Sequence, residues 1–298
     1  MSAATRLLAG AVSLAIALAA CSKVGTTRNP PVAQVRSGIV GFQLVRNATV
    51  KIDYAGTTFL VDPMLGGRGA FPGFSGTHNS HLRNPVVELP IPLSTVMEDV
   101  DAVIVTHLHP DHWDDAARSQ LPRAMPIFVQ NESDAVTVRS DGFTDVRVIG
   151  NDSTFNGTRL IRVGGQHGTD EHMEKLGHLL GDVSGVVFER PLHAGVYVAG
   201  DTTWHQEVEA AIEKHRPDVI VLNTGYASIT GFDRSIIMGK EDLARARKLA
   251  PDAVVIGVHM EAVNHAAQSR AELVQYIAEQ RLDAKLTRIP ADGESYRF

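Results

Sequence analysis

Short apolar runs separated by turn residues make up most of the chain from Gly38 onward. The first three runs are residues 39–45, 49–54 and 58–62, and each is followed by a stretch that contains Asn, Gly or Pro. Short runs rich in β-branched and aromatic side chains, bounded by such turn residues, are typical of β-strands. The pattern predicts that the folded part begins with a meander of antiparallel strands.

Further apolar runs alternate with longer amphipathic stretches in the rest of the chain. Helices are predicted at residues 206–215, 240–250 and 268–280. Strands are predicted at residues 101–106, 126–130, 145–150, 158–165, 184–190, 195–200, 218–225, 253–260 and 285–290. This mixture predicts an α/β layered architecture, in which sheets pack on each other and helices lie outside.

The composition indicates a compact domain and argues against a nucleic acid as the partner. The 298 residues are 44% hydrophobic and 21% charged, which is enough apolar side chain for a large core. The formal net charge is -6, and no cluster of Lys and Arg occurs. Nucleic-acid binding relies on basic surfaces that release counterions from phosphates, so DNA and RNA are not expected partners.

The N-terminus has the features of an export signal. Arg6 precedes fourteen apolar or small residues that end at Cys21, a run shorter than the roughly 20 residues that span a bilayer. Leu18 to Cys21 resembles the lipobox of bacterial lipoproteins, whose cysteine is acylated. We expect a signal peptide over 1–20, an acylated cysteine and tether over 21–37, and a folded domain over 38–298.

The predicted location follows from this signal. Ser22 stands where an Asp would direct inner-membrane retention, so a lipoprotein of the outer membrane that faces the periplasm is expected. The alternative is an ordinary export signal with an incidental cysteine. Cys21 is the only cysteine, so no intrachain disulfide can form.

A cluster of metal-ligand residues follows the run 101–106. His107, His109, Asp111 and His112 lie within six positions, in the order H-x-H-x-D-H. Neutral imidazoles and carboxylates bind zinc and similar divalent ions, and a two-metal centre needs such a density of donors. The alternative is a polar loop before a helix, with Asp111 as the helix cap.

Three later residues supply the donors that two metal ions would still need. His167, Asp201 and His259 each follow a predicted strand. One histidine at a strand end is more often a hydrogen-bonded structural residue than a ligand. The three together with the earlier motif favour a metal centre built from strand ends.

These motifs resemble the metallo-β-lactamase superfamily, whose signature is T-H-x-H-x-D-H followed by distant His, Asp and His. The resemblance implies a four-layer αββα sandwich with the metals at one edge of the two sheets. It assigns His107, His109 and His167 to one ion. It assigns Asp111, His112 and His259 to the other ion, with Asp201 bridging both.

Finer features of the sequence indicate which branch of the superfamily it resembles most. The segment 101–114 and the spacing of His259 and His265 are most similar to hydrolases like L-ascorbate-6-phosphate lactonase and N-acylphosphatidylethanolamine phospholipase D. Common β-lactamases use a cysteine in the second site, which this chain lacks beyond Cys21, so the name does not imply lactamase activity. Zinc is the expected metal, with manganese or iron as alternatives.

The expected activity is hydrolysis by a dinuclear centre. Two ions lower the pKa of a shared water from 15.7 toward about 7, which supplies hydroxide at neutral pH. Asp111 and Asp201 are expected to act in catalysis, and His265 is a candidate proton donor whose alternative is a structural role. The expected substrate is a small ester or lactone, with a phosphodiester as the alternative.

Other residues receive supporting roles, and two other protein classes stay open. Asp62 is expected to orient a ligand histidine, and Trp113 to pack against the scaffold. The Gly- and Pro-rich loop 63–92, which carries His78 and His81, either covers the metals or packs away from them. The alternative classes are an iron-dependent oxidoreductase of the superfamily and a non-catalytic metal-binding lipoprotein.

Overall fold

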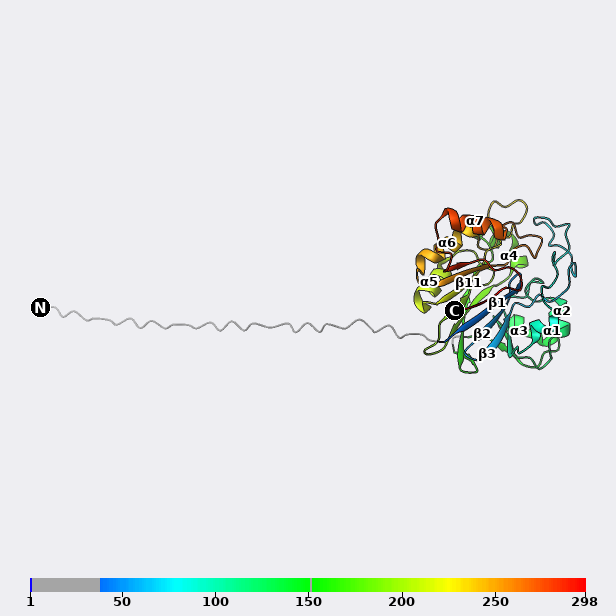
Figure 1. The fold of residues 1–298 in the computed structure, drawn as a ribbon, viewed down its shortest axis with the longest axis horizontal. Helices are drawn as coiled ribbons and strands as arrows, with labels where there is room; N and C mark the ends of the chain where they lie inside the picture. Colours follow the sequence, from blue (N-terminus) through cyan, green and yellow to red (C-terminus); the bar gives the residue numbers. More distant parts are fainter. Residues whose placement is uncertain (2–37, 151) are drawn as a thin grey trace. The chain divides into compact units, whose positions relative to one another are not determined.

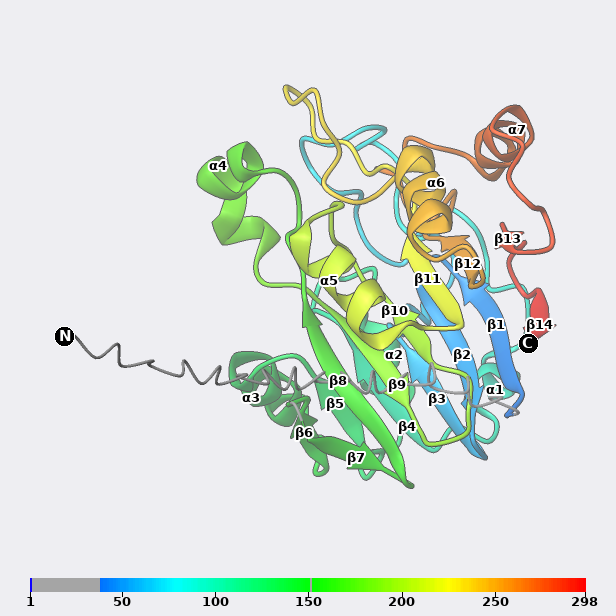
Figure 2. The ribbon, with the colours of Figure 1, turned by 90° about the vertical axis from the view of Figure 1, so that its left-hand side faces the viewer.

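Two seven-stranded sheets form the framework of the chain (Figures 1 and 2). The computed structural model describes Met1, residues 38–150 and residues 152–298. The signal peptide, the acylated cysteine and the tether expected before residue 38 lie outside the described residues, apart from Met1. The described residues from Gly38 to Phe298 belong to a single compact unit.

The first sheet has the order β14-β1-β2-β3-β4-β5-β6. Its neighbours are antiparallel from β14 to β3 and parallel from β3 to β6. The predicted meander is confirmed, because β1, β2 and β3 pair as consecutive antiparallel strands. The strands are β1 Val40–Arg46, β2 Thr49–Tyr54, β3 Thr57–Val61, β4 Ala102–Val105, β5 Ile127–Val129, β6 Val146–Val148 and β14 Ser295–Arg297.

The second sheet, in the order β13-β12-β11-β10-β9-β8-β7, repeats this plan. It is antiparallel from β7 to β10 and parallel from β10 to β13. Each half of the chain therefore builds one sheet, and only β14 returns to the first. The strands are β7 Ser153–Phe155, β8 Thr158–Gly164, β9 Ser184–Glu189, β10 Val196–Val198, β11 Val219–Asn223, β12 Val254–Val258 and β13 Thr287–Arg288.

Side chains of the inner strands alternate between two apolar layers. In β11, Val219 and Val221 belong to the core between the sheets, whereas Ile220 and Leu222 belong to the core under the helices. A strand that is buried on both faces reads as a continuous apolar run, which is the pattern seen in the sequence. The predicted packing of sheet on sheet, with helices outside, is confirmed.

Helices cover the outer face of each sheet (Figure 2). Buried residues of α1 (Leu93–Met97), α2 (Asp115–Gln120) and α3 (Glu132–Ser140) join the apolar cluster on the first sheet. Those of α5 (Gln206–His215), α6 (Lys240–Leu249) and α7 (Arg270–Glu279) join the cluster on the second. Among the described residues, no helix combines the length and apolar character needed to cross a membrane.

The helix α4 (Asp170–Leu180) lies apart from the others and packs on a loop. Its Leu180 belongs to a small cluster with Ala227, Ile236 and Ile237. The sequence analysis predicted α5, α6 and α7 but named none of the first four helices, of which α1 and α2 have only five and six residues. Such short helices carry too few turns to show a periodic apolar face.

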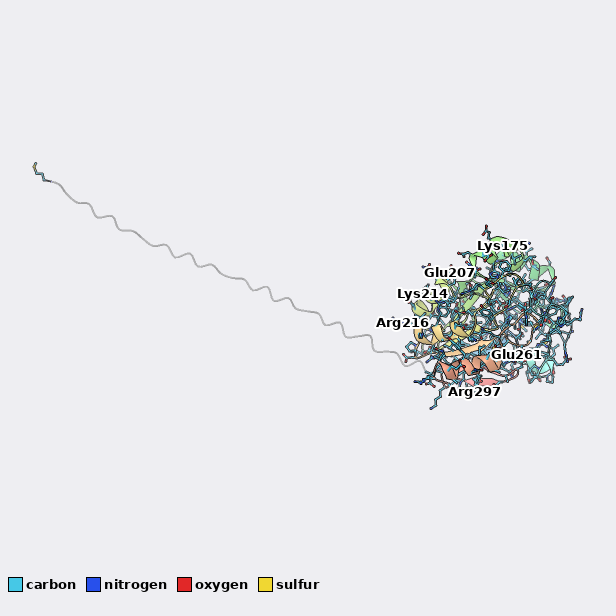
Figure 3. All side chains as sticks on the ribbon, turned by 90° about the horizontal axis from the view of Figure 1, so that it is seen from above. Lys175, Glu207, Lys214, Arg216, Glu261 and Arg297 are labelled. Carbon is cyan, nitrogen blue, oxygen red and sulfur yellow. The ribbon has the colours of Figure 1, made fainter. Side chains whose placement is uncertain are left out.

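Charged side chains of both signs lie on the outer surface of the domain. Figure 3 labels Lys175, Lys214 and Glu261 among them, and all three are exposed. This arrangement keeps the charged groups hydrated while the sheets and the inner helix faces exclude water.

The long loop 63–92 is held in place by buried polar side chains. Arg46, which is fully buried, donates to the carbonyl oxygens of Met64 and Gly66 at 2.8 Å. Asn264 accepts from the Phe74 amide at 3.0 Å and from the Asn84 side chain at 2.8 Å. The loop also meets the second half of the chain, where Thr230 N donates to the carbonyl of Gly76 at 2.8 Å.

Candidate metal centre

All seven predicted ligands converge at the carboxyl ends of strands from both sheets. Four follow β4, and the others follow β8, β10 and β12, so the two halves of the chain contribute to one site. The potential ligand atoms fall into two groups, within each of which they lie no more than 4.8 Å apart. The groups are His107, His109 and His167, and Asp111, His112, Asp201 and His259.

The second group surrounds one carboxylate oxygen. His112 Nε2 lies 3.2 Å and His259 Nε2 lies 3.5 Å from Asp201 Oδ2. His259 Nε2 is also 3.3 Å from Asp111 Oδ2. These four residues are at most 2% exposed, so their polar atoms face one another rather than solvent.

Asp201 also reaches the first group. His167 Nε2 lies 3.8 Å from Asp201 Oδ2, the same oxygen that the second group surrounds. The His109 and His167 rings have centroids 5.1 Å apart, and the His107 ring lies 4.1 Å from that of His112. One carboxylate oxygen of Asp201 therefore lies within 3.8 Å of nitrogen atoms from both groups.

Hydrogen bonds at the far side of three imidazoles fix which nitrogen faces the site. His112 Nδ1 is bound to Asp62 Oδ2 at 2.9 Å, and His167 Nδ1 donates to the Ile236 carbonyl at 3.0 Å. His109 Nε2 donates to the carbonyl of Leu179 in α4 at 3.1 Å. Partners of this kind set the tautomer and leave the opposite nitrogen free as a ligand.

The buried carboxylates shift the protonation of the second group. Burial alone lowers the pKa of His259, but Asp201 and Asp111 outweigh it and raise the pKa to about 9. Burial is likewise outweighed at His112, where Asp201 and Asp62 hold the pKa well above its usual range. Burial raises the pKa of Asp201, yet His112 and His259 bring it well below normal. Without a cation, the histidines carry the positive charge that balances the carboxylates.

This charge balance predicts how the stability of the metal-free protein depends on pH. The pKa of His259 rises from an ordinary 6.5 to about 9, so its contribution to stability is complete below pH 6.5 and is lost as the pH rises toward 9. Each such histidine lowers the unfolding free energy by up to about 1.4 kcal/mol per pH unit. Urea unfolding of chelator-treated protein between these pH values measures the slope.

His259→Gln is the matched variant for this measurement. It removes one of the two titrating histidines, so the metal-free variant should lose stability less steeply over the same range. A metal-free wild-type protein that gains stability as the pH rises would contradict the assignment of protons to His112 and His259.

The residues present fit divalent metal ions. His107 Nε2 is buried and has no hydrogen-bond partner. His112 Nε2 and His259 Nε2 face each other at 3.2 Å with carboxylate oxygens on either side. The site therefore gathers imidazole nitrogens and carboxylate oxygens at one point, where a cation can take the place of the protons on His112 and His259. Imidazoles with carboxylates are the donor set that zinc, manganese and iron accept.

Two strand-end residues adopt backbone conformations that are rare outside glycine. Asp62 follows β3 with φ 48°, and His259 follows β12 with φ 67°. Such left-handed residues persist where the surroundings hold them, and they are frequent at functional sites. Asp62 also accepts from the Thr106 amide at 2.7 Å, and its contact with His112 agrees with the predicted role of orienting a ligand.

Sequence reasoning missed several residues that position the ligands. Asn223, the last residue of β11, donates to Asp201 Oδ1 at 2.6 Å. Asn47, in the β1–β2 turn, donates to the Asp111 carbonyl at 3.1 Å and accepts from the His259 amide at 2.9 Å. A polar residue that ends an otherwise apolar strand was the available signal for Asn223. Nothing local distinguishes Asn47 from an ordinary turn residue.

The remaining predicted residues have varied positions. His265 is buried, and its ring centroid lies 6.1 Å from that of His259. Trp113 packs in the core, as expected, and its Nε1 bonds Asp141 at 3.2 Å. His78 and His81 are exposed.

The capping role considered for Asp111 is wrong. Asp114 is the N-cap of α2, where its Oδ1 accepts from the Ala117 amide at 2.8 Å. Asp111 lies three residues earlier and turns into the site instead, because the helix begins only at Asp115.

Comparisons with known proteins agree with this architecture. Residues 57–260 match the family described as Beta-lactamase superfamily domain. UPF0173 protein YddR of Bacillus subtilis is 45% identical over 254 residues, which cover 85% of this chain and 98% of the relative. The crystal structure of a possible metal-dependent hydrolase from Veillonella parvula shares 43% identity with a TM-score of 0.85, covering 87% of this chain and 99% of that chain.

A second solved structure has a more specific description. The isothiocyanate hydrolase from Delia radicum gut bacteria is 42% identical with a TM-score of 0.82. The match covers 87% of this chain and 99% of that chain. It therefore spans the folded domain of both proteins.

The sandwich of two sheets and the His/Asp cluster at its edge define a metal-dependent hydrolase. The chain belongs to the metallo-β-lactamase superfamily and, within it, to the UPF0173 family. The predicted fold class and the predicted enzyme class are thereby confirmed.

Proposed function

We propose that this protein holds two divalent metal ions, zinc first among them, and hydrolyses small organic isothiocyanates. Two observations support the proposal. The seven-donor cluster has two groups joined by Asp201, which suits a pair of ions. The relative of 42% identity that spans the whole domain is an isothiocyanate hydrolase. Manganese and iron are the alternative metals, because the donor set biases metal selection without deciding it.

The ions would lower the pKa of bound water toward neutrality and polarise the substrate carbon. The protein's own residues prepare for this chemistry. Asp201 is held by Asn223 at one oxygen and exposes the other to both groups of ligands. Asp62 keeps the His112 ring in one orientation. Such fixed partners place the reacting groups without reorganisation during the reaction.

His265 is the residue that we propose to pass a proton from the attacking water to the leaving group. Burial lowers the pKa of His265 to about 4, so the ring is neutral near pH 7 and takes up that proton before it donates it. It lies at the edge of the second group, and its Nδ1 is buried without a hydrogen-bond partner. The Phe74 ring contacts it edge-on at 4.7 Å between centroids, which fixes the plane of the imidazole. A general acid must be near the leaving atom, and His265 is close enough to the ligands for that role.

The reaction balances with water alone. For an isothiocyanate R–N=C=S, the water oxygen forms a bond to the carbon and the carbon–nitrogen bond breaks. Both water protons end on nitrogen, which gives the amine R–NH₂ and carbonyl sulfide. A small ester or lactone is the second candidate, because segment 101–114 resembles lactonase-like hydrolases and water attacks an electrophilic carbon in both cases. Phosphodiesters are the third.

The proposal is tested by assaying the metal-loaded protein on benzyl isothiocyanate, a lactone, a carboxyl ester and a phosphodiester. We expect release of benzylamine and carbonyl sulfide with the first substrate. His109→Ala should lose this activity, because it removes one donor of the first group. Turnover of another class with no attack on the isothiocyanate would assign a different substrate. Activity that is indifferent to His109→Ala would exclude the cluster as the catalytic site.

We also propose that the enzyme is a lipoprotein of the outer membrane, as its N-terminal sequence suggests. The match to the Bacillus relative covers 98% of that protein but 85% of this chain, so part of this chain lies outside the match. Labelling with radioactive palmitate in a Gram-negative host should mark the wild type and not Cys21→Ser. Equal labelling of both would exclude acylation at this cysteine.

A further inference from the structure

A small apolar pocket lies beside the metal centre. It has a volume of about 250 Å³ and is lined by loop 63–92 and by the start of α2. Pro110, which stands between the ligands His109 and Asp111 in the chain, forms part of its wall. The other apolar lining residues are Ala70, Phe71, Pro72, Phe74 and Ala116.

Ring contacts connect this pocket to the ligands. The Phe71 and Phe74 rings meet edge-on with centroids 6.1 Å apart. Phe74 in turn contacts His265 at 4.7 Å, and His265 lies 6.1 Å from His259. Phe74 therefore lines the pocket and also contacts the residue beside His259, so the pocket and the His/Asp cluster share one wall.

Most polar groups in the pocket wall already have partners. Asp114 Oδ2 accepts from the Gly66 amide at 2.7 Å, and its Oδ1 caps α2. Arg118 pairs with Asp115 at 3.0 Å, and the Asp115 side chain is 95% exposed. Arg118 Nε is buried without a hydrogen-bond partner, but both lining carboxylates have partners and six of the nine lining residues are apolar, so the pocket favours an apolar group.

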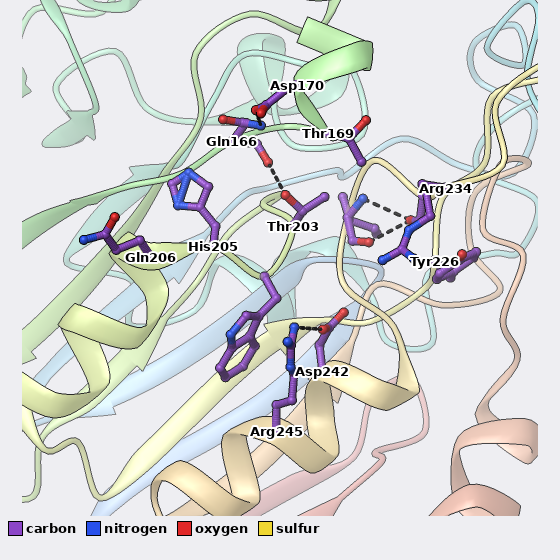
Figure 4. A pocket seen from close by; sticks show the side chains of 13 residues that line it. Gln166, Thr169, Asp170, Thr203, His205, Gln206, Tyr226, Arg234, Asp242 and Arg245 are labelled. Atoms are coloured by element: carbon purple, nitrogen blue, oxygen red, sulfur yellow. Dashed lines mark hydrogen bonds and ion pairs between the residues drawn. The ribbon is translucent and has the colours of Figure 1, made fainter.

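A second pocket near the centre has the opposite character (Figure 4). It has a volume of about 340 Å³ and lies beside Gln166, the residue before His167. Its lining includes Asp170, Arg234, Asp242 and Arg245, all charged. An apolar substituent would displace water from these four charged side chains, so this pocket is the poorer place for it.

We propose that the pocket formed by Phe71, Phe74, Pro110 and Ala116 binds the apolar side chain of the substrate and sets its preferred size. This assignment rests on the proposed hydrolytic function of the adjacent centre. Benzene fills an engineered apolar cavity of about 150 Å³ in another protein, so a pocket of 250 Å³ accommodates an aryl group. The substrate class is an electrophile that carries an aryl or short alkyl substituent.

Binding of inert carboxylates tests the pocket without turnover. A carboxylate can reach the metal-loaded centre while its substituent occupies the pocket. Calorimetry with the full metal-loaded chain should show that phenylacetate binds at least about tenfold more tightly than acetate. Ala116→Leu fills the pocket, and Phe71→Ala removes one wall, so each should reduce this ratio toward one while acetate affinity stays the same.

A variant far from the pocket serves as the control. Val136→Ala changes an exposed residue of α3 and should keep the wild-type ratio. A wild-type protein that binds phenylacetate no better than acetate would overturn the assignment. So would an unchanged ratio in Ala116→Leu, a variant that keeps a good helix former in α2.

Turnover separates this proposal from the proposed function. If the wild type prefers phenylacetate but does not cleave benzyl isothiocyanate, the pocket stands and the isothiocyanate substrate is wrong. If it cleaves benzyl and methyl isothiocyanate equally and Ala116→Leu changes neither rate, the substrate stands and the pocket is wrong.

Discussion

Asp201→Asn should reduce kcat/KM by at least about a thousandfold, because metal-dependent stabilisation of a transition state is worth several kcal/mol. The substitution keeps the size of the side chain but removes its negative charge. Asp201 Oδ2 lies 3.2 Å from His112, 3.5 Å from His259 and 3.8 Å from His167, so both groups of ligands lose their shared oxygen. Elemental analysis of the purified variant should show fewer metal ions per chain, alongside the kinetic loss.

A surface variant controls for a general effect of the same substitution. Asp252 is exposed, and Asp252→Asn should retain wild-type activity and metal content. Circular dichroism should show that both variants are folded. If Asp201→Asn kept its activity within a fewfold of wild type, the carboxylate would not connect the two groups functionally, and a single metal held by His107, His109 and His167 would become the better description.

Removing the metal ions should abolish hydrolysis and lower the melting temperature. A ligand that binds only the folded state adds about 2.7 kcal/mol when its concentration is a hundredfold above Kd. For a domain of this size that corresponds to a shift on the order of 5 to 10 °C. Differential scanning calorimetry before and after chelation, and again after zinc is restored, measures the effect.

The expected thermal shift has a structural cause. Asp111, Asp201, His112 and His259 are buried together, and without a cation their charges are balanced only by protons on the two histidines. His107→Ala should bring the melting temperature of the untreated protein toward that of the chelated one. Full activity after exhaustive chelation would show that the cluster is structural and that the hydrolytic site lies elsewhere.

The local pattern of apolar, polar and ligand residues was sufficient to predict most of the strands and the metal-binding chemistry of the site. The apolar run 218–225 identified β11 because both of its faces are buried, and β4 was identified for the same reason. The motif from His107 to His112 indicated a metal centre, because four potential metal ligands within six positions are rarely found at other kinds of site. His167, Asp201 and His259 were recognisable from their places after strands together with the resemblance.

The helices show where the local sequence pattern was not sufficient to predict an element. α5 matched its predicted bounds from Gln206 to His215, since three of its residues repeat on one buried face. α4 was missed, although Thr169 and His172 form a capping box at its start. Its apolar residues pack on the loop around Ile236 rather than on a sheet, so its place depends on a long-range contact.

The sequence by itself determined the class of this protein: a layered α/β domain with a His/Asp metal centre built from strand ends. Only the tertiary structure decided which residues serve that centre. Asn223 and Asn47 bind residues of the His/Asp cluster, Asp114 rather than Asp111 caps α2, and Phe71 and Phe74 line a pocket near that cluster. Periodicity and ligand spacing are local properties of the chain, whereas these contacts join residues that are far apart in sequence and meet only when the two sheets pack.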